Sequence, residues 1–393
     1  MNILYISVLS SQSTLDEVLK QKPDSAYSPA AQKFNRLIAE GIAKNGEKIT
    51  ALSTFFAKTK GLIWHHNSET KNGVRYKYIP TPLWGPLRYF ALLLFSFFYV
   101  FFWGLMGRKS KVVVCDALNV SVCLGASIAA KILNLKCVGI VTDIPGLRPG
   151  AGLDDLKNAA KNEKFNLKML SLFSHYVFLT EEMHSVINPC NNKYLVIEGT
   201  VDSTYEIPDT VKKEKKKVVL YAGALREEYG LRLLIEGFIK ADVCDSELWL
   251  FGDGSYVEGV LEYEKEYANV RYFGKKTNSV VLDAELKSCL LVNPRPTQEE
   301  YTQYSFPSKN MEYMLSGTPL LTTLLPGMPK EYYPFVYLFD KGENVDGYAQ
   351  VIRDVLTKPA EELKEKGRLA REWVLDNKNN IKQTKRLLDF VLN

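Results

Sequence analysis

Short runs of apolar and β-branched residues recur along the whole 393-residue chain, and a helical pattern separates each run from the next. This alternation is typical of parallel sheets wound by helices. The strands expected in the first half are Ile3–Val8, Lys48–Leu52, Tyr76–Ile79, Val112–Cys115, Val138–Thr142, Tyr176–Leu179 and Tyr194–Ile197. Those of the second half are Val218–Ala222, Leu248–Phe251, Val270–Phe273, Leu290–Asn293, Leu320–Thr323 and Val336–Phe339. The pattern predicts an α/β protein with two similar parallel sheets.

A polar segment with linker composition separates the two sheets, from Asp202 to a lysine-rich run that ends at Lys217. The domains expected from the sequence are an N-terminal domain at 1–202, a linker at 203–217 and a second domain at 218–365. The remaining residues, 366–393, read as charged amphipathic helices. One interpretation is that they cross back to the first domain.

Composition excludes several classes of protein. A hydrophobic content of 46% and a charged content of 24% are those of an ordinary globular protein. A net charge of +5 is too small to indicate nucleic acid, and no nucleic-acid motif is present, but the charge suits anionic substrates or an anionic membrane surface. The first residues form a β-rich run and not a signal peptide.

Cysteine and histidine usage indicates a reducing, cytosolic setting without a metal centre. The six cysteines are widely spread and form no Cys-x-x-Cys pair. The four histidines show no metal-ligand spacing, and we assign no metal.

One apolar segment breaks the soluble pattern. Between Tyr89 and Met106 the only clearly polar side chain is Ser96, and basic residues flank the segment on both sides. Three interpretations are open: a membrane span, a helix lying in the cytoplasmic leaflet, or a buried core helix. A span would separate strands that belong to one sheet. We therefore expect a membrane-associating helix over 84–107, which makes the protein peripheral to the inner face of the cell membrane.

A short helix near residue 310 carries a lysine and a glutamate in its opening turns. Pro307 cannot extend a helix toward its N-terminus, Ser308 is a suitable N-cap, and Gly317 is a stop signal. The free N–H groups of a first turn attract phosphate, and Lys309 adds positive charge there. Alternatively, Lys309 and Glu312 are ordinary partners of the helix dipole.

Glycines follow three strands of the second sheet, where open α/β folds bind ligands. Gly223, Gly252 and Gly274 occupy these strand ends, and each would let a phosphate approach the backbone. Arg226, three residues after Gly223, is a candidate to clamp a diphosphate and to assist catalysis.

These pieces, in this order, resemble the nucleotide-binding domain of GT-B-fold glycosyltransferases, in particular the large retaining family four that includes bacterial polysaccharide enzymes. The resemblance covers about 130 residues and rests mainly on Phe306-Pro307-Ser308-Lys309, Glu312-Tyr313-Met314 and Ser316-Gly317-Thr318-Pro319. It implies two Rossmann-like doubly wound domains facing across a cleft. It also implies a UDP-sugar donor, a glycan or polyprenyl-diphosphate-linked acceptor and metal-independent transfer.

The resemblance also implies site residues. Glu312 matches the glutamate that binds the ribose hydroxyls, and Lys309 would hold the diphosphate and act in catalysis. Gly274 and Lys275 would lie beside the base. The donor-binding residues expected in full are Gly223, Gly252, Gly274, Lys275, Glu299, Glu300, Tyr304, Ser305, Phe306, Ser308, Lys309 and Glu312.

The sequence departs from the family pattern at two positions. The family commonly has a second glutamate where Tyr304 stands, and Glu299 and Glu300 are candidates for the missing acid. It also commonly has an arginine and a lysine in the first glycine loop, where this chain has Tyr229 before Gly230.

The first domain offers one catalytic candidate. Asp143 follows an expected strand and would orient or deprotonate the acceptor hydroxyl, although an aspartate at a strand end also serves in turns. The predicted function is a retaining glycosyltransferase. The alternatives are a non-catalytic GT-B partner subunit and a nucleotide-sugar epimerase.

Overall fold

The chain forms two compact units, which we describe from a computed structural model. The structure describes residues 1–21, 29–54, 63–64, 66–82, 85–107, 110–147, 161–188, 190–208 and 212–392. The first unit holds the described residues of 1–147, 161–200 and 379–392, and the second holds those of 201–378.

The first unit is built on an eight-stranded sheet in the order β10-β9-β8-β7-β1-β2-β5-β4. All neighbouring strands in it are parallel except β4 and β5. The strands are β1 (Asn2–Ser7), β2 (Lys48–Ser53), β4 (Glu69–Lys71), β5 (Val74–Tyr78), β7 (Lys111–Asp116), β8 (Lys136–Val141), β9 (His175–Phe178) and β10 (Lys193–Val196). A separate antiparallel pair joins β3 (Ile63–Trp64) to β6 (Thr81–Pro82).

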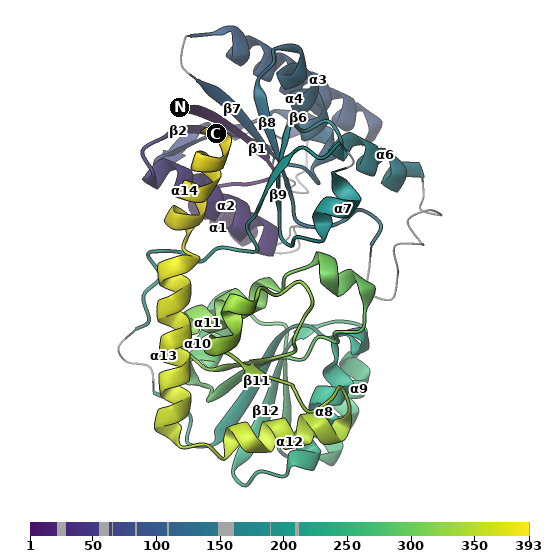
Figure 1. The fold of residues 1–393 in the computed structure, drawn as a ribbon, viewed down its shortest axis with the longest axis vertical. Coiled ribbons are helices and arrows are strands. Elements are labelled where there is room, and N and C mark those ends of the chain that lie inside the picture. Colours follow the sequence, from purple (N-terminus) through teal and green to yellow (C-terminus); the bar gives the residue numbers. More distant parts are fainter. Residues whose placement is uncertain are drawn as a thin grey trace. The chain divides into compact units, whose positions relative to one another are not determined.

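Helices cover both faces of this sheet (Figure 1). They are α1 (Gln12–Gln21), α2 (Pro29–Lys44), α3 (Gly85–Leu105), α4 (Val120–Ile132), α6 (Lys161–Leu170), α7 (Met183–Ile187) and α14 (Asn380–Leu392). Alternate strand residues such as Tyr5, Ala51 and Tyr76 form one core with α2 and α14. The other face packs on α4.

The C-terminal helix α14 belongs to the first unit and lies beside α2 (Figure 1). Asn45, directly after α2, donates hydrogen bonds to Ile381 O at 2.8 Å and to Thr384 Oγ1 at 2.9 Å. A Cβ on Gly41 would lie 2.3 Å from Asn380 O, so only glycine permits this close approach. The chain thus ends in the unit where it began.

The second unit has a six-stranded parallel sheet in the order β13-β12-β11-β14-β15-β16. Its strands are β11 (Lys217–Ala224), β12 (Ser246–Asp253), β13 (Val270–Gly274), β14 (Leu290–Asn293), β15 (Leu320–Thr322) and β16 (Tyr337–Leu338). Its helices are α8 (Leu231–Ala241), α9 (Val257–Glu266), α10 (Asn278–Lys287), α11 (Ser308–Ser316), α12 (Val345–Leu356) and α13 (Ala360–Asn377). Three short 3-10 helices are η1 (Glu227–Tyr229), η2 (Glu300–Tyr304) and η3 (Lys330–Phe335).

The strand predictions are confirmed, since every expected strand overlaps an observed one. The sequence interpretation missed β3, β4 and β6, which carry the antiparallel pairings. β4 returns to β5 through Asn72 and Gly73, both with positive φ (49° and 78°). An Asn-Gly pair between two strands is a hairpin signal, but these strands are too short for an alternating pattern.

The boundaries differ from those expected. The second unit extends to Lys378 and not to residue 365, because α13 packs on α11. The described part of the expected linker also belongs to this unit: Lys213 Nζ donates to Ser288 O at 2.6 Å and to Thr318 Oγ1 at 2.8 Å. Burial lowers the pKa of Lys213 to about 8.

The apolar segment forms the 21-residue helix α3, which is long and apolar enough to cross a membrane by length and composition alone. It does not do so within this fold, because β1, β2 and β5 before it join β7 and β8 after it in one sheet. One face of α3, including Leu92, Ser96 and Val100, is buried, and the helix packs on α4. Of the basic residues that flank the segment, Arg108 and Lys109 lie outside the described residues, as does Trp84 at the start of the expected helix.

A glycine on α4 allows the backbone of α3 to pack close to α4. A Cβ on Gly125 would lie 2.1 Å from Leu93 O, on the backbone of α3. We expect Gly125→Ala to lower the free energy of unfolding by about 1–3 kcal/mol, because the two helices must separate. Chemical denaturation measures this. Gly85→Ala is the matched control, since nothing lies within 4 Å of the added carbon. Equal stability of the two variants would contradict the packing.

Candidate functional site

The strand order of the second sheet reverses between β11 and β14. From β11 the chain continues to β12 and β13 on one side, then returns to β14, β15 and β16 on the other. Open parallel sheets bind ligands at the carboxyl ends of the strands beside such a reversal. Residues at the ends of β11 and β14 are therefore the first candidates for a ligand site.

The predicted glycines occupy these strand ends. Gly223 and Gly252 lie opposite each other on β11 and β12. A Cβ on Gly252 would lie only 1.8 Å from Gly223 O, and its φ of 138° also requires glycine. Gly274 ends β13 with a φ of 71°, and the neighbouring Lys275 is exposed. Glycine at position 252 therefore permits the close approach of β11 and β12, and a Cβ on Gly223 would lie 2.8 Å from the Tyr221 hydroxyl.

Helix α11 begins one residue earlier than the sequence indicated. The N-cap is Pro307, whose carbonyl accepts a hydrogen bond from Asn310 N at 2.9 Å. The predicted cap, Ser308, is the first helical residue and is exposed. The error arises because Pro307 in an extended conformation (ψ 107°) itself serves as the flanking residue. The predicted stop is confirmed, since Gly317 caps the helix with a φ of 74°.

Two buried polar side chains fix α11 against the strand ends. Asn310 Oδ1 accepts a hydrogen bond from Asn293 Nδ2, at the end of β14, at 2.7 Å. The Tyr313 hydroxyl accepts from Ala222 N at 2.8 Å and donates to Ala222 O at 3.2 Å, which ties the helix to β11. Because both side chains are buried, the opening turns of α11 are held at the reversal point.

Lys309 and Glu312 pair with each other, and a third residue joins them. Lys309 Nζ lies 2.8 Å from Glu312 Oε2 and 3.7 Å from Glu285 Oε1 on α10, and the Glu285 side chain is fully buried. Burial lowers the pKa of Lys309, but the two carboxylates outweigh it and the net shift is upward. Burial and the same two carboxylates raise the pKa of Tyr205. Lys309 therefore balances two carboxylates and orients Glu312.

Two arginines approach the ring of Tyr229, beside the ends of β11 and β14. Arg295, two residues after β14, has its guanidinium carbon 4.8 Å from the centre of the Tyr229 ring and 5.7 Å from that of Tyr301. Arg226 lies 5.9 Å from the Tyr229 ring and also pairs with Glu228 at 3.6 Å. The rings hold guanidinium groups near the strand ends through cation–π attraction.

The loop between β14 and α11 holds the remaining predicted residues. Glu299 and Glu300 lie at the start of η2, and Glu299 O accepts a hydrogen bond from Thr302 Oγ1 at 2.6 Å. Tyr304 and Phe306 are buried, and the Phe306 ring packs 5.3 Å from that of Tyr332. Ser305 Oγ lies 3.5 Å from the Arg295 guanidinium. Phe306 therefore packs as a core residue, whereas Ser305 touches the arginine cluster.

Comparison with known proteins gives a family match for this unit. Residues 202–373, most of the second unit, match the family model of glycosyl transferases group 1. The second unit is therefore similar to a group 1 glycosyltransferase domain. No curated protein sequence matches the chain.

Solved structures of glycosyltransferases resemble the chain over its whole length. Sucrose-phosphate synthase from Thermosynechococcus elongatus is 14% identical with a TM-score of 0.68, and the alignment covers 100% of this chain and 99% of that one. HepE from Anabaena in complex with UDP is 13% identical with a TM-score of 0.62, and 99% of each chain is covered. An α,α-trehalose-phosphate synthase (UDP-forming) from Burkholderia vietnamiensis is 10% identical with a TM-score of 0.65, again with 99% of each chain covered. Identities this low show the fold alone, which is GT-B.

The resemblance to glycosyltransferases bears on the role of Arg226 and Arg295. In the family that the sequence resembles, the first glycine loop commonly has an arginine and a lysine. In this chain the Arg295 guanidinium, two residues after β14, lies over the ring of Tyr229 in that loop. The sequence interpretation named Arg226 but did not assign a role to Arg295. Its place two residues after a strand at the reversal point was the signal that could have indicated it.

The catalytic candidate of the first unit, Asp143, follows β8 and is exposed. Thr142 Oγ1 donates a hydrogen bond to its Oδ2 at 3.3 Å. In this sheet the strand order reverses between β1 and β7, so β8 lies one strand away from the reversal.

A different carboxylate, Asp116, lies at the reversal point of the first sheet. It ends β7, is 5% exposed, and accepts hydrogen bonds from Ser7 Oγ (2.9 Å), Asn35 Nδ2 (2.9 Å) and Asn119 Nδ2 (2.5 Å). Burial raises the pKa of Asp116 to about 6, although these hydrogen bonds lower it. The sequence interpretation missed Asp116 because it treated the run before it only as a strand.

No group of three or more His, Cys, Asp or Glu side chains that could hold a metal ion occurs within the described residues.

The raised pKa of Asp116 predicts a pH dependence of stability. Because the folded-state value exceeds the ordinary one of about 3.9, the native state binds the proton more tightly, and this contribution is lost as pH rises through about 6. Relative to Asp116→Asn, we expect the unfolding free energy of the wild type to fall by about 3 kcal/mol between roughly pH 4 and 7. Urea denaturation across this range tests it, with the exposed Asp389→Asn as control. Parallel curves for wild type and Asp116→Asn would refute the assignment.

Proposed function

We propose that this protein is a retaining glycosyltransferase that moves a sugar from a UDP-sugar to a glycan or a polyprenyl-diphosphate-linked acceptor. We further propose a role in bacterial cell-surface or exopolysaccharide synthesis. The observation that carries the transferase proposal is the position of Glu312: Asn310 and Tyr313 fix its helix at the strand ends of a group 1 glycosyltransferase domain.

The choice of donor is supported by the bound molecules of one structural relative. HepE has been solved with UDP, with UDP and glucose, and with UDP-glucose. The chain has a backbone feature that suits such a donor, namely the first turn of α11 beside the strand ends of the second sheet.

We assign the donor contacts as follows. Glu312 binds the ribose hydroxyls, and Lys309 holds its carboxylate in place through the 2.8 Å ion pair. Arg295 and Arg226 face the diphosphate, because neither is enclosed by two carboxylates as Lys309 is. Gly274 and Lys275 lie beside the base. We therefore assign the binding of the diphosphate, first predicted for Lys309, mainly to these two arginines.

The proposed reaction needs no enzyme nucleophile. The acceptor hydroxyl oxygen forms a bond to the anomeric carbon on the face that the diphosphate leaves. The bond from that carbon to the phosphate oxygen breaks, and the acceptor proton passes to the leaving diphosphate. The arginines and the N-terminus of α11 stabilise the charge that develops there, which permits transfer without a divalent metal.

We also propose that the protein is cytoplasmic and peripheral to the inner face of the cell membrane. The exposed apolar face of α3 supports this, since Tyr89, Phe90 and Phe102 are all more than half exposed, at 64%, 60% and 55%. A lipid-linked acceptor would be reached from such a position.

The roles of Glu312 and Lys309 can be tested by substitution. Glu312→Ala should lower kcat/KM for the donor on the order of hundredfold, because it removes a preorganised partner of the ribose. Lys309→Ala should do the same, and the double variant should be little worse than either, because the lysine acts through the glutamate. Lys358→Ala, from an exposed i,i+4 pair on the surface, is the matched control.

These rates are best measured with and without EDTA, and equal rates are expected. Product NMR gives the configuration at the anomeric carbon, and inversion would refute the retaining mechanism. Unchanged turnover in both single variants would contradict the site itself. Absence of calorimetric heat with any nucleotide sugar would instead favour a non-catalytic partner subunit. Conversion of free donor without an acceptor would favour an epimerase.

The role of Arg295 has its own test. Arg295→Ala should lower kcat by roughly a hundredfold with a smaller change in KM, because the lost charge acts on the leaving diphosphate. Arg295→Lys should recover part of the rate, since it keeps the charge but not the planar stacking on Tyr229. Arg232→Ala, an exposed arginine on α8 paired with Glu236, is the control. Wild-type kcat in Arg295→Ala would exclude the assignment.

A further inference from the structure

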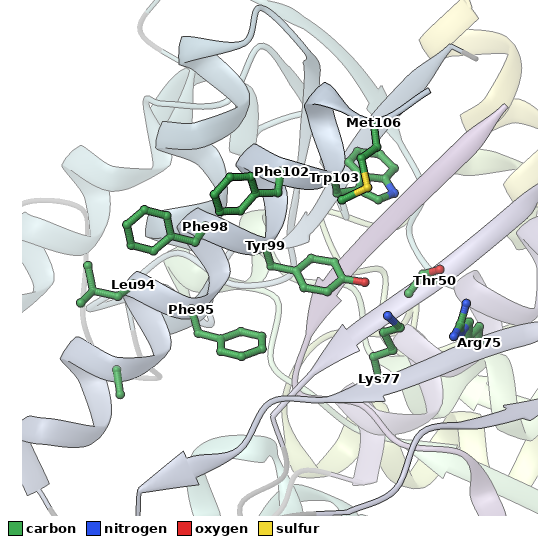
Figure 2. Close-up of a pocket in the computed structure, with 11 residues that line it drawn as sticks. Thr50, Arg75, Lys77, Leu94, Phe95, Phe98, Tyr99, Phe102, Trp103 and Met106 are labelled. Atoms are coloured by element: carbon green, nitrogen blue, oxygen red, sulfur yellow. The ribbon is translucent and has the colours of Figure 1, made fainter. Parts of the chain in front are cut away.

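The outer face of α3 borders a cavity on the first unit, at the end of the sheet that holds β2 and β5. Its volume is about 770 Å³, within the range of small-molecule sites. One wall consists of side chains from α3, including Phe95, Phe98 and Phe102. The other wall consists of strand residues that face the same side of the sheet (Figure 2). We name this cavity the α3 groove.

The apolar wall of the α3 groove is exposed, although its side chains are large. Phe95 is 40%, Phe98 49% and Phe102 55% exposed. The rings stack along the helix, with centres 6.3 Å apart for Phe98 and Phe102. On the opposite side of the helix Leu92, Ser96 and Val100 are buried. The helix therefore uses one face for the core and presents an aromatic row outward.

The polar wall of the α3 groove is cationic. Thr50 on β2 pairs in register with Arg75 on β5, and Lys77 follows on the same face of that strand. Lys77 Nζ lies 5.3 Å from the centre of the Tyr99 ring, which extends from α3 toward the strands (Figure 2). The described lining contains these two cations and no carboxylate. Such a wall attracts a phosphate.

We propose that the α3 groove binds an anionic phospholipid of the membrane, with a hydrocarbon chain against the aromatic row and the phosphate on Lys77 and Arg75. A helix with an exposed aromatic face and nearby cations is suited to the boundary between headgroups and chains. The helix itself does not span, because the sheet continues on both sides of it. This inference rests on the membrane association proposed above and names the lipid that the α3 face would bind, and it does not depend on the donor site.

Two other occupants fit the α3 groove less well. A second copy of the chain, related by two-fold symmetry, would bring a second Arg75 and Lys77 to the same face, which like-charge repulsion opposes. A lipid-linked acceptor would have to reach the carboxyl ends of the strands. Lys77 lies near the carboxyl end of β5, but Lys111, the first residue of β7, donates to Trp103 O at 2.8 Å, so the groove extends from Lys77 toward the amino ends.

Flotation with vesicles tests the proposal. We expect the protein to float with phosphatidylcholine vesicles that contain phosphatidylglycerol. The Arg75→Glu, Lys77→Glu double variant should bind at least about tenfold less, since each basic residue near an anionic surface is worth roughly a factor of five. Lys382→Glu, an exposed lysine on α14 that packs on the other face of the sheet, is the matched control and should float as wild type. Equal loss in the control, or none in the double variant, would overturn the cationic site.

Trp103 lines the α3 groove, so its fluorescence reports on a hydrocarbon chain of a lipid bound there. Phosphatidylglycerol brominated on its acyl chain should quench part of the tryptophan fluorescence, and Trp103→Phe should abolish that part. Phe98→Ser with Phe102→Ser should reduce flotation, and both are surface changes compatible with folding. Flotation without quenching of Trp103 would refute chain binding in the groove. A lipid-free dimer that Phe98→Ser dissociates would refute the lipid in favour of a second copy.

The proposed lipid site and the proposed donor site can be refuted independently of each other. Calorimetry with UDP should give the same affinity for wild type and for the Arg75→Glu, Lys77→Glu variant, whichever way flotation turns out. A variant that loses both activities would contradict the independence of the groove.

Discussion

A parallel sheet must be covered on both faces, and most of this structure follows from that requirement. In the first unit, α2 and α14 cover one face and α4 the other. The C-terminal helix is part of this cover, which explains why the chain returns to the unit in which it began. Over β2 and β5, α3 turns its aromatic row outward, and the cover is incomplete at the α3 groove.

The same topology determines where charge gathers. The second sheet reverses its strand order at β11 and β14, so groups that follow these strands meet. Two kinds of charged arrangement are found there. Lys309 lies between a buried and a partly exposed carboxylate, whereas Arg295 is held by aromatic rings. An ammonium between carboxylates can orient them, but a guanidinium on a ring keeps its donors available for an anion.

The sequence predicted much of the fold because its signals are local. Most strand runs are apolar or β-branched and bounded by turn residues, and Gly252 and Gly274 mark strand ends where φ is positive. The start of α11 was misplaced by one residue, since Pro307 and Ser308 are both plausible at a helix start. The short strands β3, β4 and β6 were missed because two or three residues show no alternation.

The site was only partly predictable, and the reason is distance along the chain. Lys309 and Glu312 lie three positions apart on one helix, so the sequence placed them together, although their ion pair was seen only in the structure. Glu285, Arg295 and Asp116 acquire their surroundings from other strands and helices: Asp116 meets Ser7 and Asn35, residues more than 80 positions away.

By itself, the sequence determined the strand–helix alternation, the two sheets, the glycine-ended strands and the existence of an apolar helix. Only the tertiary structure decided which cations face a ligand, which carboxylate is buried, and which face of α3 is exposed. Local backbone preference and periodicity act between near neighbours, whereas burial and electrostatic pairing depend on residues that only the folded chain brings together.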